Sequence, residues 1–129
     1  MEDGSWGAGP GEALAEISTG IVQLYRRHYG QGPSESKTHL VEDAVVCTLR
    51  GTFTRAERTL IEQGDHESVH AMRSAFQKGM KAAFTAVVER ALNRRVIAFM
   101  SLVHIDPDMS IEIFFLEPLA VPTSPDVLA

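Results

Sequence analysis

The sequence contains a single cysteine, Cys47, among its 129 residues. One thiol cannot form a disulfide within the chain, and because Cys47 ends the apolar run 44–47 we expect it to be buried and reduced. Long apolar runs are missing too: the longest, 96–103, includes Ser101 and is far shorter than the ~20 residues of a membrane-spanning helix. We therefore expect a cytoplasmic protein whose association with membrane components is peripheral.

An excess of positive charge is also missing. The formal net charge is −5, whereas proteins that bind nucleic acid normally carry a basic face. The basic clusters 26–28 and 90–95 fall at the expected C-terminal ends of two helices, where the helix dipole favours cations. Residues 1–4 include two acidic side chains and no apolar segment follows them, which is unlike a secretory signal. We therefore expect no nucleic-acid partner and no export.

The composition that is present is ordinary for a globular protein. Hydrophobic residues make up 44% of the chain and charged residues 22%. The length suffices for one domain with one core. Residues 1–11 are rich in glycine and residues 119–129 contain prolines, so both segments are predicted to be flexible tails. The sequence thus predicts a single domain over residues 12–118.

Apolar residues at three- and four-residue spacing predict the helices. The longest such stretch, 65–95, has Asp65 as its expected N-cap and makes one long amphipathic helix. A first helix over 12–29 is expected to end at Gly30. Residues Thr54 to Glu57 have the form of a capping box, which predicts a short helix that begins at residue 55.

Short β-prone runs predict two hairpins. The first pairs 38–41 with 44–49, and the second pairs 96–105 with 110–116. The element order is therefore α-β-β-α-α-β-β. This order predicts an α+β fold of two layers, in which helices cover one face of an antiparallel sheet of about four strands.

The last predicted strand has two different faces. Ile111, Ile113 and Phe115 alternate with Ser110 and Glu112, which predicts that the first three are buried and the other two face water. Two apolar residues interrupt the face that is expected to be wet, Phe114 and Leu116. An apolar patch on that face would be an interface between copies of the chain, so we expect a homo-oligomer, most simply a dimer.

Residues 66–70 spell the H-E-x-x-H motif, in which two histidines bind zinc and the glutamate activates a water molecule. The ligands would be His66 and His70, with Glu67 as the base. Glu89 is nineteen residues after His70, about 28 Å along the same helix, too far for a third ligand. A zinc-dependent hydrolase therefore remains an alternative that needs a ligand from elsewhere. Two other histidines are candidates, His39 and His104.

Two further groups of polar residues allow both a structural and a functional interpretation. His104, Asp106 and Asp108 meet at the expected second hairpin turn, where a small-ligand sensor would place its pocket, although aspartate is also common in turns. Glu57 and Arg58 form either a recognition pair or a surface ion pair. No arrangement of a nucleophile with a base follows from spacing alone, so the chain is interpreted as non-enzymatic and without a cofactor.

Taken together, several short segments resemble a bacterial family, the MpsC-like domain. The similarity covers about residues 14–118. In that family a small subunit is assigned to a sodium-translocating system that generates membrane potential, and many members have no known function. The segments that carry the resemblance are GQGP at 30–33, TRAERTL at 54–60, FQ at 76–77, HIDP at 104–107 and EIFFLEP at 112–118.

The resemblance implies an accessory role rather than a known reaction. A chain without a membrane span cannot itself move sodium through a bilayer, so it would act as a partner or regulator of membrane components. His66 and His70 lie outside the matching segments. The residues within them are the candidates for a functional surface: Gly32, Pro33, Glu57, Arg58, His104, Asp106, Pro107 and Glu117.

Overall fold

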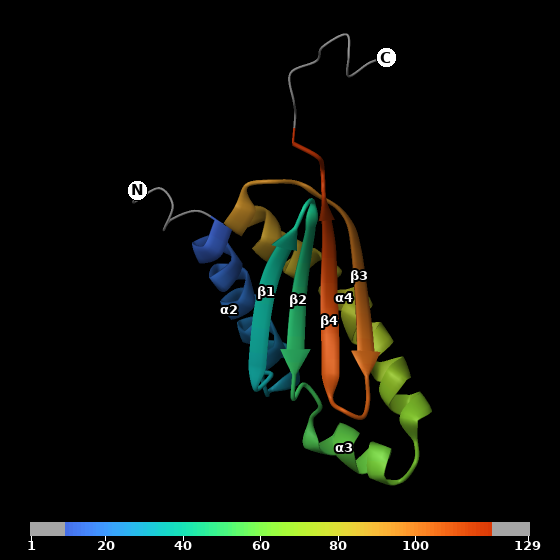
Figure 1. Cartoon of the computed structure of the whole chain (residues 1–129). Helices are drawn as coiled ribbons and strands as arrows, with labels where there is room; N and C mark the ends of the chain where they lie inside the picture. The colour runs from blue at the N-terminus through green and yellow to red at the C-terminus, as the bar shows by residue number, and fades with distance from the viewer. Residues whose placement is uncertain (1–9, 120–129) are drawn as a thin grey trace.

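The computed structural model describes residues 10–119, which fold into three helices and four strands (Figure 1). Their order is α-β-β-α-α-β-β, and this confirms the predicted α+β class. The predicted tails fall largely outside the described residues. The elements are α2 (Pro10–Tyr29), β1 (Glu35–Val41), β2 (Ala44–Arg50), α3 (Arg55–Glu62), α4 (His66–Leu92), β3 (Val96–His104) and β4 (Met109–Leu116).

The four strands form one antiparallel sheet in the order β1-β2-β4-β3. Each predicted hairpin is present, and β4 lies between β2 and β3. The register places Glu112 of β4 between Cys47 on one side and Ser101 on the other. A local irregularity between Val96 and Ala98 shifts the register where β3 begins.

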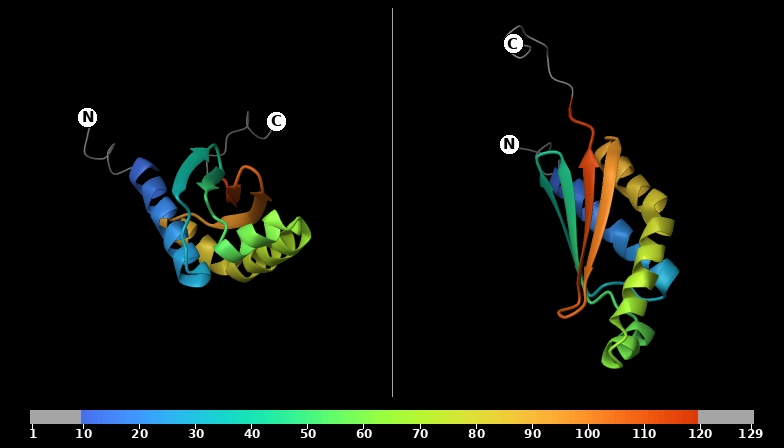
Figure 2. Two further views of the ribbon diagram at one scale, coloured as in Figure 1. Left: turned by 90° about the horizontal axis from the view of Figure 1, so that it is seen from below. Right: turned by 90° about the vertical axis from the view of Figure 1, so that its right-hand side faces the viewer.

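Helices α2 and α4 run in opposite directions across the same face of the sheet (Figures 1 and 2). The core lies between these two layers. Its aromatic centre is Phe84 of α4, whose ring lies 5.8 Å from that of Tyr25 and 6.2 Å from that of Phe99. Cys47 is buried in this core, as its apolar neighbours predicted. None of the helices among residues 10–119 is long and apolar enough to cross a membrane.

Capping explains where the helices begin and end. The Thr54 hydroxyl accepts from the Glu57 amide at 3.2 Å and the Glu57 carboxylate accepts from the Thr54 amide at 2.8 Å, which is the predicted capping box. Asp65 accepts from the Ser68 amide at the start of α4. The predicted end of this helix at residue 95 was wrong, because Asn93 takes a left-handed conformation and α4 ends at Leu92.

Helix α2 also differs from its predicted bounds. It begins at Pro10, so residues 10 and 11, predicted to belong to a flexible tail, are helical. Proline is favoured in the first turn of a helix because its missing N–H has no partner there in any case.

The predicted orientation of β4 was wrong. Ser110, Glu112, Phe114 and Leu116 face the helices and are buried, whereas the isoleucines and Phe115 face away from them. Two neighbours explain why polar residues can point inward: the Ser101 hydroxyl donates to the Glu112 carboxylate, and Ser110 lies within hydrogen-bond distance of a threonine hydroxyl. An alternation of period two defines two faces but does not say which one is covered.

Candidate functional site

The loop between β2 and α3 joins several elements at one end of the sheet. The carboxylate of Asp108, from the β3–β4 turn, accepts hydrogen bonds from the backbone amides of Thr52 at 3.0 Å and Phe53 at 3.1 Å. The Thr52 hydroxyl donates to the same carboxylate at 3.2 Å. The Asp108 carboxylate is therefore used in hydrogen bonds to this loop. It is not free to bind a cation, which the sequence had left as a possibility.

A buried ion pair links α3 to α4 behind this loop. Arg73 exposes 1% of its side-chain surface and Glu57 exposes none, and their closest N–O distances are 2.7 Å. Arg73 also donates to the carbonyl oxygen of Thr52. Burial alone would raise the pKa of Glu57, but hydrogen bonds from Arg73 and Thr54 outweigh burial and lower it. The pair is therefore charged at neutral pH.

Aromatic rings complete the surroundings of Arg73. Its guanidinium carbon lies 4.4 Å from the ring centroid of Tyr29, 5.0 Å from that of Phe53 and 6.0 Å from that of Tyr25. Burial raises the pKa of Tyr29, although the nearby guanidinium opposes this. Because neither Arg73 nor Glu57 reaches the surface, the pair cannot contact a substrate, and its role is to hold α3 against α4.

Most of the candidate residues from the sequence gather at this end of the molecule. The side chain of Arg58 is exposed, and its guanidinium donates to the carbonyl oxygen of Phe53 at 2.7 Å. The predicted pair between Arg58 and Glu57 is therefore not formed. Pro33 is buried, whereas Gly32 packs against the side chain of Arg26. The surface role of these residues stays a prediction.

The β3–β4 turn supplies the exposed part of this end. His104 Nδ1 lies 2.9 Å from the carbonyl oxygen of Pro107. The side chains of His104, Asp106 and Pro107 are exposed.

Glu117 lies at the opposite end of the sheet from these residues. It follows β4, and its carbonyl oxygen accepts a hydrogen bond from Arg94 at 2.9 Å. Arg94 also pairs with Asp43 of the β1–β2 turn at 2.7 Å. The structure therefore separates Glu117 from the other candidates, and one continuous site cannot contain all of them.

The two histidines of the H-E-x-x-H motif are exposed at the start of α4. Within residues 10–119, no group of three or more histidine, cysteine or acidic side chains is arranged to hold a metal ion. The third ligand that the zinc hypothesis requires is therefore not supplied by this part of the chain. Neither His39 nor His104 completes the site.

Glu112 is a second buried acidic residue, which sequence reasoning placed in water. Its side chain is fully buried, and the Ser101 hydroxyl donates to both carboxylate oxygens, to Oε2 at 2.8 Å. Burial raises the pKa of Glu112 to about 7, which the hydrogen bond from Ser101 and the distant charge of Arg73 oppose. The sequence offered one sign that Glu112 could be buried: Ser101, a polar residue on the strand predicted to pair with it.

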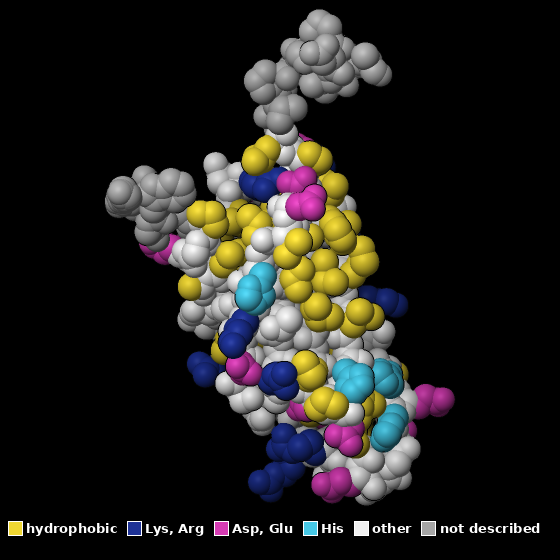
Figure 3. All heavy atoms as spheres, viewed as in Figure 1, with side chains coloured by type: hydrophobic (Ala, Val, Ile, Leu, Met, Phe, Trp, Pro, Cys, Tyr) yellow, Lys and Arg dark blue, Asp and Glu magenta, His cyan; other side chains and the backbone are white. Residues whose placement is uncertain are grey.

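The outer side of the sheet carries several exposed apolar side chains. No helix among the described residues covers it, and hydrophobic side chains gather over the strands there (Figures 2 and 3). The exposed fractions are 64% for Leu102, 58% for Val41 and 49% for Met100. We call this surface the open sheet face; its apolar members are Val41, Ala44, Val46, Ala98, Met100, Leu102, Ile111, Ile113 and Phe115.

One end of the open sheet face carries charges of both signs. Glu35 of β1 pairs with Lys37 at 3.6 Å and with Arg50 of β2 at 3.3 Å. All three side chains are substantially exposed, so these pairs add little stability to the fold. The face thus has an apolar centre and a mixed polar edge, which is the usual composition of a protein-binding surface.

These features define a small two-layer α+β domain with a filled core and an uncovered apolar sheet face. The chain belongs to the MpsC family: residues 10–118 match the family model described as "Na+-translocating membrane potential-generating system (MpsC)". The match covers most of the chain and confirms the resemblance seen in the sequence. Searches of the curated proteins and of the solved structures returned no match.

Proposed function

We propose that this chain is a non-enzymatic accessory domain of a membrane-potential-generating system, and that it works as a homodimer joined through the open sheet face. The observation that carries the proposal is the exposure of Leu102, Met100 and Val41 on the outer face of the two edge strands, β3 and β1. An apolar surface of this kind is costly to leave in water, and a binding partner removes the cost. The family description supplies the link to the membrane system.

A second copy suits this surface in size. Four strands at ~4.8 Å spacing and about eight residues at ~3.3 Å rise give a face of roughly 19 by 26 Å, or about 500 Å². Two copies packed face to face would bury on the order of 1,000 Å² or more, which reaches the lower end of specific interfaces. Sheets that pack in this way lie about 10 Å apart.

The charges support self-association as well. In a dimer with a twofold axis the same surface of each copy meets the other, so the charges on that surface must not repel their counterparts. The open sheet face is uncharged at its centre, and Glu35, Lys37 and Arg50 provide both signs at its edge. A partner of one charge sign would gain little from such an edge.

Contacts with the membrane components would then use other surfaces. We propose the exposed end formed by Arg58, His104, Asp106 and Pro107 for this role, because it lies around the β3–β4 turn and α3, at the end of the sheet beyond its apolar centre. Gly32, Pro33 and Glu57 would shape that end from beneath, and Glu117 would act separately. The buried thiol of Cys47 is consistent with the cytoplasm, where we place the protein.

Sedimentation equilibrium of the full chain tests the dimer. The wild type is expected to sediment as a dimer at micromolar concentration, and Leu102→Glu as a monomer, because the substitution places a like charge in both copies. Met72→Glu is the matched control: Met72 on α4 is 42% exposed and lies away from the sheet, so this variant should remain dimeric. A monomeric wild type, or equal effects of both variants, would overturn the proposed dimer.

The accessory role is tested separately in cells that lack the chain. A voltage-sensitive dye should report a lowered membrane potential, which the wild-type chain restores and the Leu102→Glu variant restores poorly. Thermal melting of the purified variant shows whether it is folded, as we expect for a residue already exposed to solvent. An unchanged membrane potential in cells without the chain would contradict the accessory role and leave the dimer standing.

A further inference from the structure

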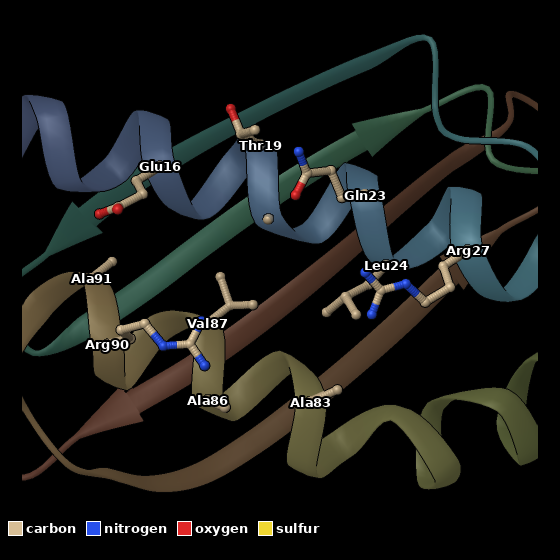
Figure 4. A pocket seen from close by; sticks show the side chains of 11 residues that line it. Glu16, Thr19, Gln23, Leu24, Arg27, Ala83, Ala86, Val87, Arg90 and Ala91 are labelled. Atoms are coloured by element: carbon tan, nitrogen blue, oxygen red, sulfur yellow. The ribbon is translucent and has the colours of Figure 1, made fainter.

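A groove of about 550 Å³ runs between α2 and α4 on the side of the helix layer that faces away from the sheet (Figure 4). We call it the helix groove. Both helices contribute to it, and its floor includes Gly20 and Leu24 of α2 and Val87 of α4. The helix groove is separated from the open sheet face by the full thickness of the domain.

Small side chains create this groove. At Gly20 the helices are so close that an added Cβ atom would lie 2.7 Å from Cγ1 of Val87. On α4 the neighbouring positions that line the groove are alanines, which leave space above the contact. The apolar floor is therefore fixed by direct packing of the two helices. The alanines concerned are Ala83, Ala86 and Ala91.

Two cationic side chains enter the groove from opposite ends. Figure 4 shows the guanidinium groups of Arg27, from α2, and Arg90, from α4, directed toward each other over the floor. Within residues 10–119 neither arginine forms an ion pair or a side-chain hydrogen bond. Glu16 also lines the groove, so its three charged side chains leave an excess of one positive charge, which favours an anionic ligand. Thr19 and Gln23 add neutral hydrogen-bonding groups along the same wall.

The length of the groove indicates what kind of anion it fits. Along α2 the lining extends from Glu16 to Arg27, about 16 Å at 1.5 Å per residue. About five residues of extended peptide span this length. The groove is a concave channel between two helices, so it fits a narrow segment of chain rather than the flat surface of a bilayer.

We propose that the helix groove binds an acidic peptide segment of a protein partner. Its carboxylates pair with Arg27 and Arg90, and its small apolar side chains contact the floor at Gly20 and Val87. This site is independent of the open sheet face, so it would be available in a monomer and in the proposed dimer alike.

A synthetic peptide of about ten alternating glutamate and alanine residues, which exceeds the length of the groove, is the probe. NMR titration of the isotope-labelled full chain is expected to shift the amide signals of Thr19, Gln23 and Ala86. The same peptide with lysine in place of glutamate should shift none of them. Shifts that fall mainly outside α2 and α4, or equal shifts with both peptides, would overturn the proposal.

Charge-reversal variants show whether the peptide binds at Arg27 and Arg90 or responds only to the net charge of the protein. The double variant Arg27→Glu/Arg90→Glu should weaken binding at least about tenfold. Lys78→Glu/Lys81→Glu changes the net charge by the same amount at exposed positions of α4 that line a different pocket, and it should bind like the wild type. Equal losses in both variants would contradict the site. Displacement of the peptide by inorganic phosphate, or preferential binding to anionic lipid vesicles, would also contradict it.

Discussion

Arg73 of α4 pairs with Glu57 of α3 at 2.7 Å in a place where neither side chain is exposed to solvent by more than 1%. The same carboxylate caps the start of α3 through the Thr54 amide, and the same guanidinium holds the carbonyl oxygen of Thr52. One ion pair therefore fixes a short helix, α3, against α4. Helix α3 itself has few contacts with the sheet. It also orders the end of the molecule that we propose as a contact surface.

Arg73→Met is expected to destabilise the protein by about 3–5 kcal/mol, because it leaves the Glu57 carboxylate buried without its partner. Urea unfolding followed by circular dichroism measures the change. The double variant Glu57→Gln/Arg73→Met removes both charges and should recover part of the loss. If Arg73→Met changed the free energy of unfolding by less than about 1 kcal/mol, the structural role of the pair would be refuted.

Glu112→Gln is expected to change how stability depends on pH. Burial raises the pKa of Glu112 from 4.5 to about 7, so the folded protein binds a proton more tightly than the unfolded chain. The favourable contribution of this group is complete below pH 4.5 and is lost as the pH rises to 7. The loss is on the order of 3 kcal/mol. Urea unfolding between pH 4.5 and 8 should show a smaller decline in the variant than in the wild type.

Parallel curves for the wild type and Glu112→Gln would show that Glu112 does not titrate in this range. Ser101→Ala provides an independent check, because the serine hydroxyl stabilises the ionised carboxylate. Removal of that hydrogen bond should raise the pKa of Glu112 further, and the decline in stability should then extend to higher pH. An unchanged profile would contradict the assigned hydrogen bond.

Asp108→Ala is expected to destabilise the fold by about 1–3 kcal/mol, since the amides of Thr52 and Phe53 lose their acceptor at the same time. Asp106→Ala in the same turn is the matched control. Asp106 is exposed, and its loss should change the free energy of unfolding by less than about 0.5 kcal/mol. Thermal melting of both variants decides the point, and equal effects would be incompatible with the assigned contacts.

Much of the fold followed from local signals in the sequence. The capping box at Thr54 and Glu57, the N-cap at Asp65 and the two hairpins act over a few residues, so sequence reasoning located each of them. The predicted ends of helices were less accurate where the conformation of a single residue ends the helix. Asn93 ended α4 because it adopts a left-handed conformation that periodicity does not reveal.

The site was harder to predict because it depends on contacts between distant residues. Arg73 belongs to a helix that the sequence described only as amphipathic, and its partner Glu57 is on another element. Glu112 was placed in water for the same reason, because its partner Ser101 is on a neighbouring strand. The inverted orientation of β4 hid the open sheet face. The surface patch expected at Phe114 and Leu116 was wrong, because both side chains are buried and the exposed apolar side chains lie on the opposite face of the sheet.

An isotope-filtered NOE experiment shows whether two copies meet through the open sheet face. A mixture of ¹³C-labelled and unlabelled chains would be examined for NOEs between copies. We expect such NOEs from the methyl groups of Leu102, Ile111 and Ile113 and none from Leu24 or Val87 in the helix groove. Absent intermolecular NOEs in a monomeric sample, or NOEs confined to the helix layer, would contradict this interface.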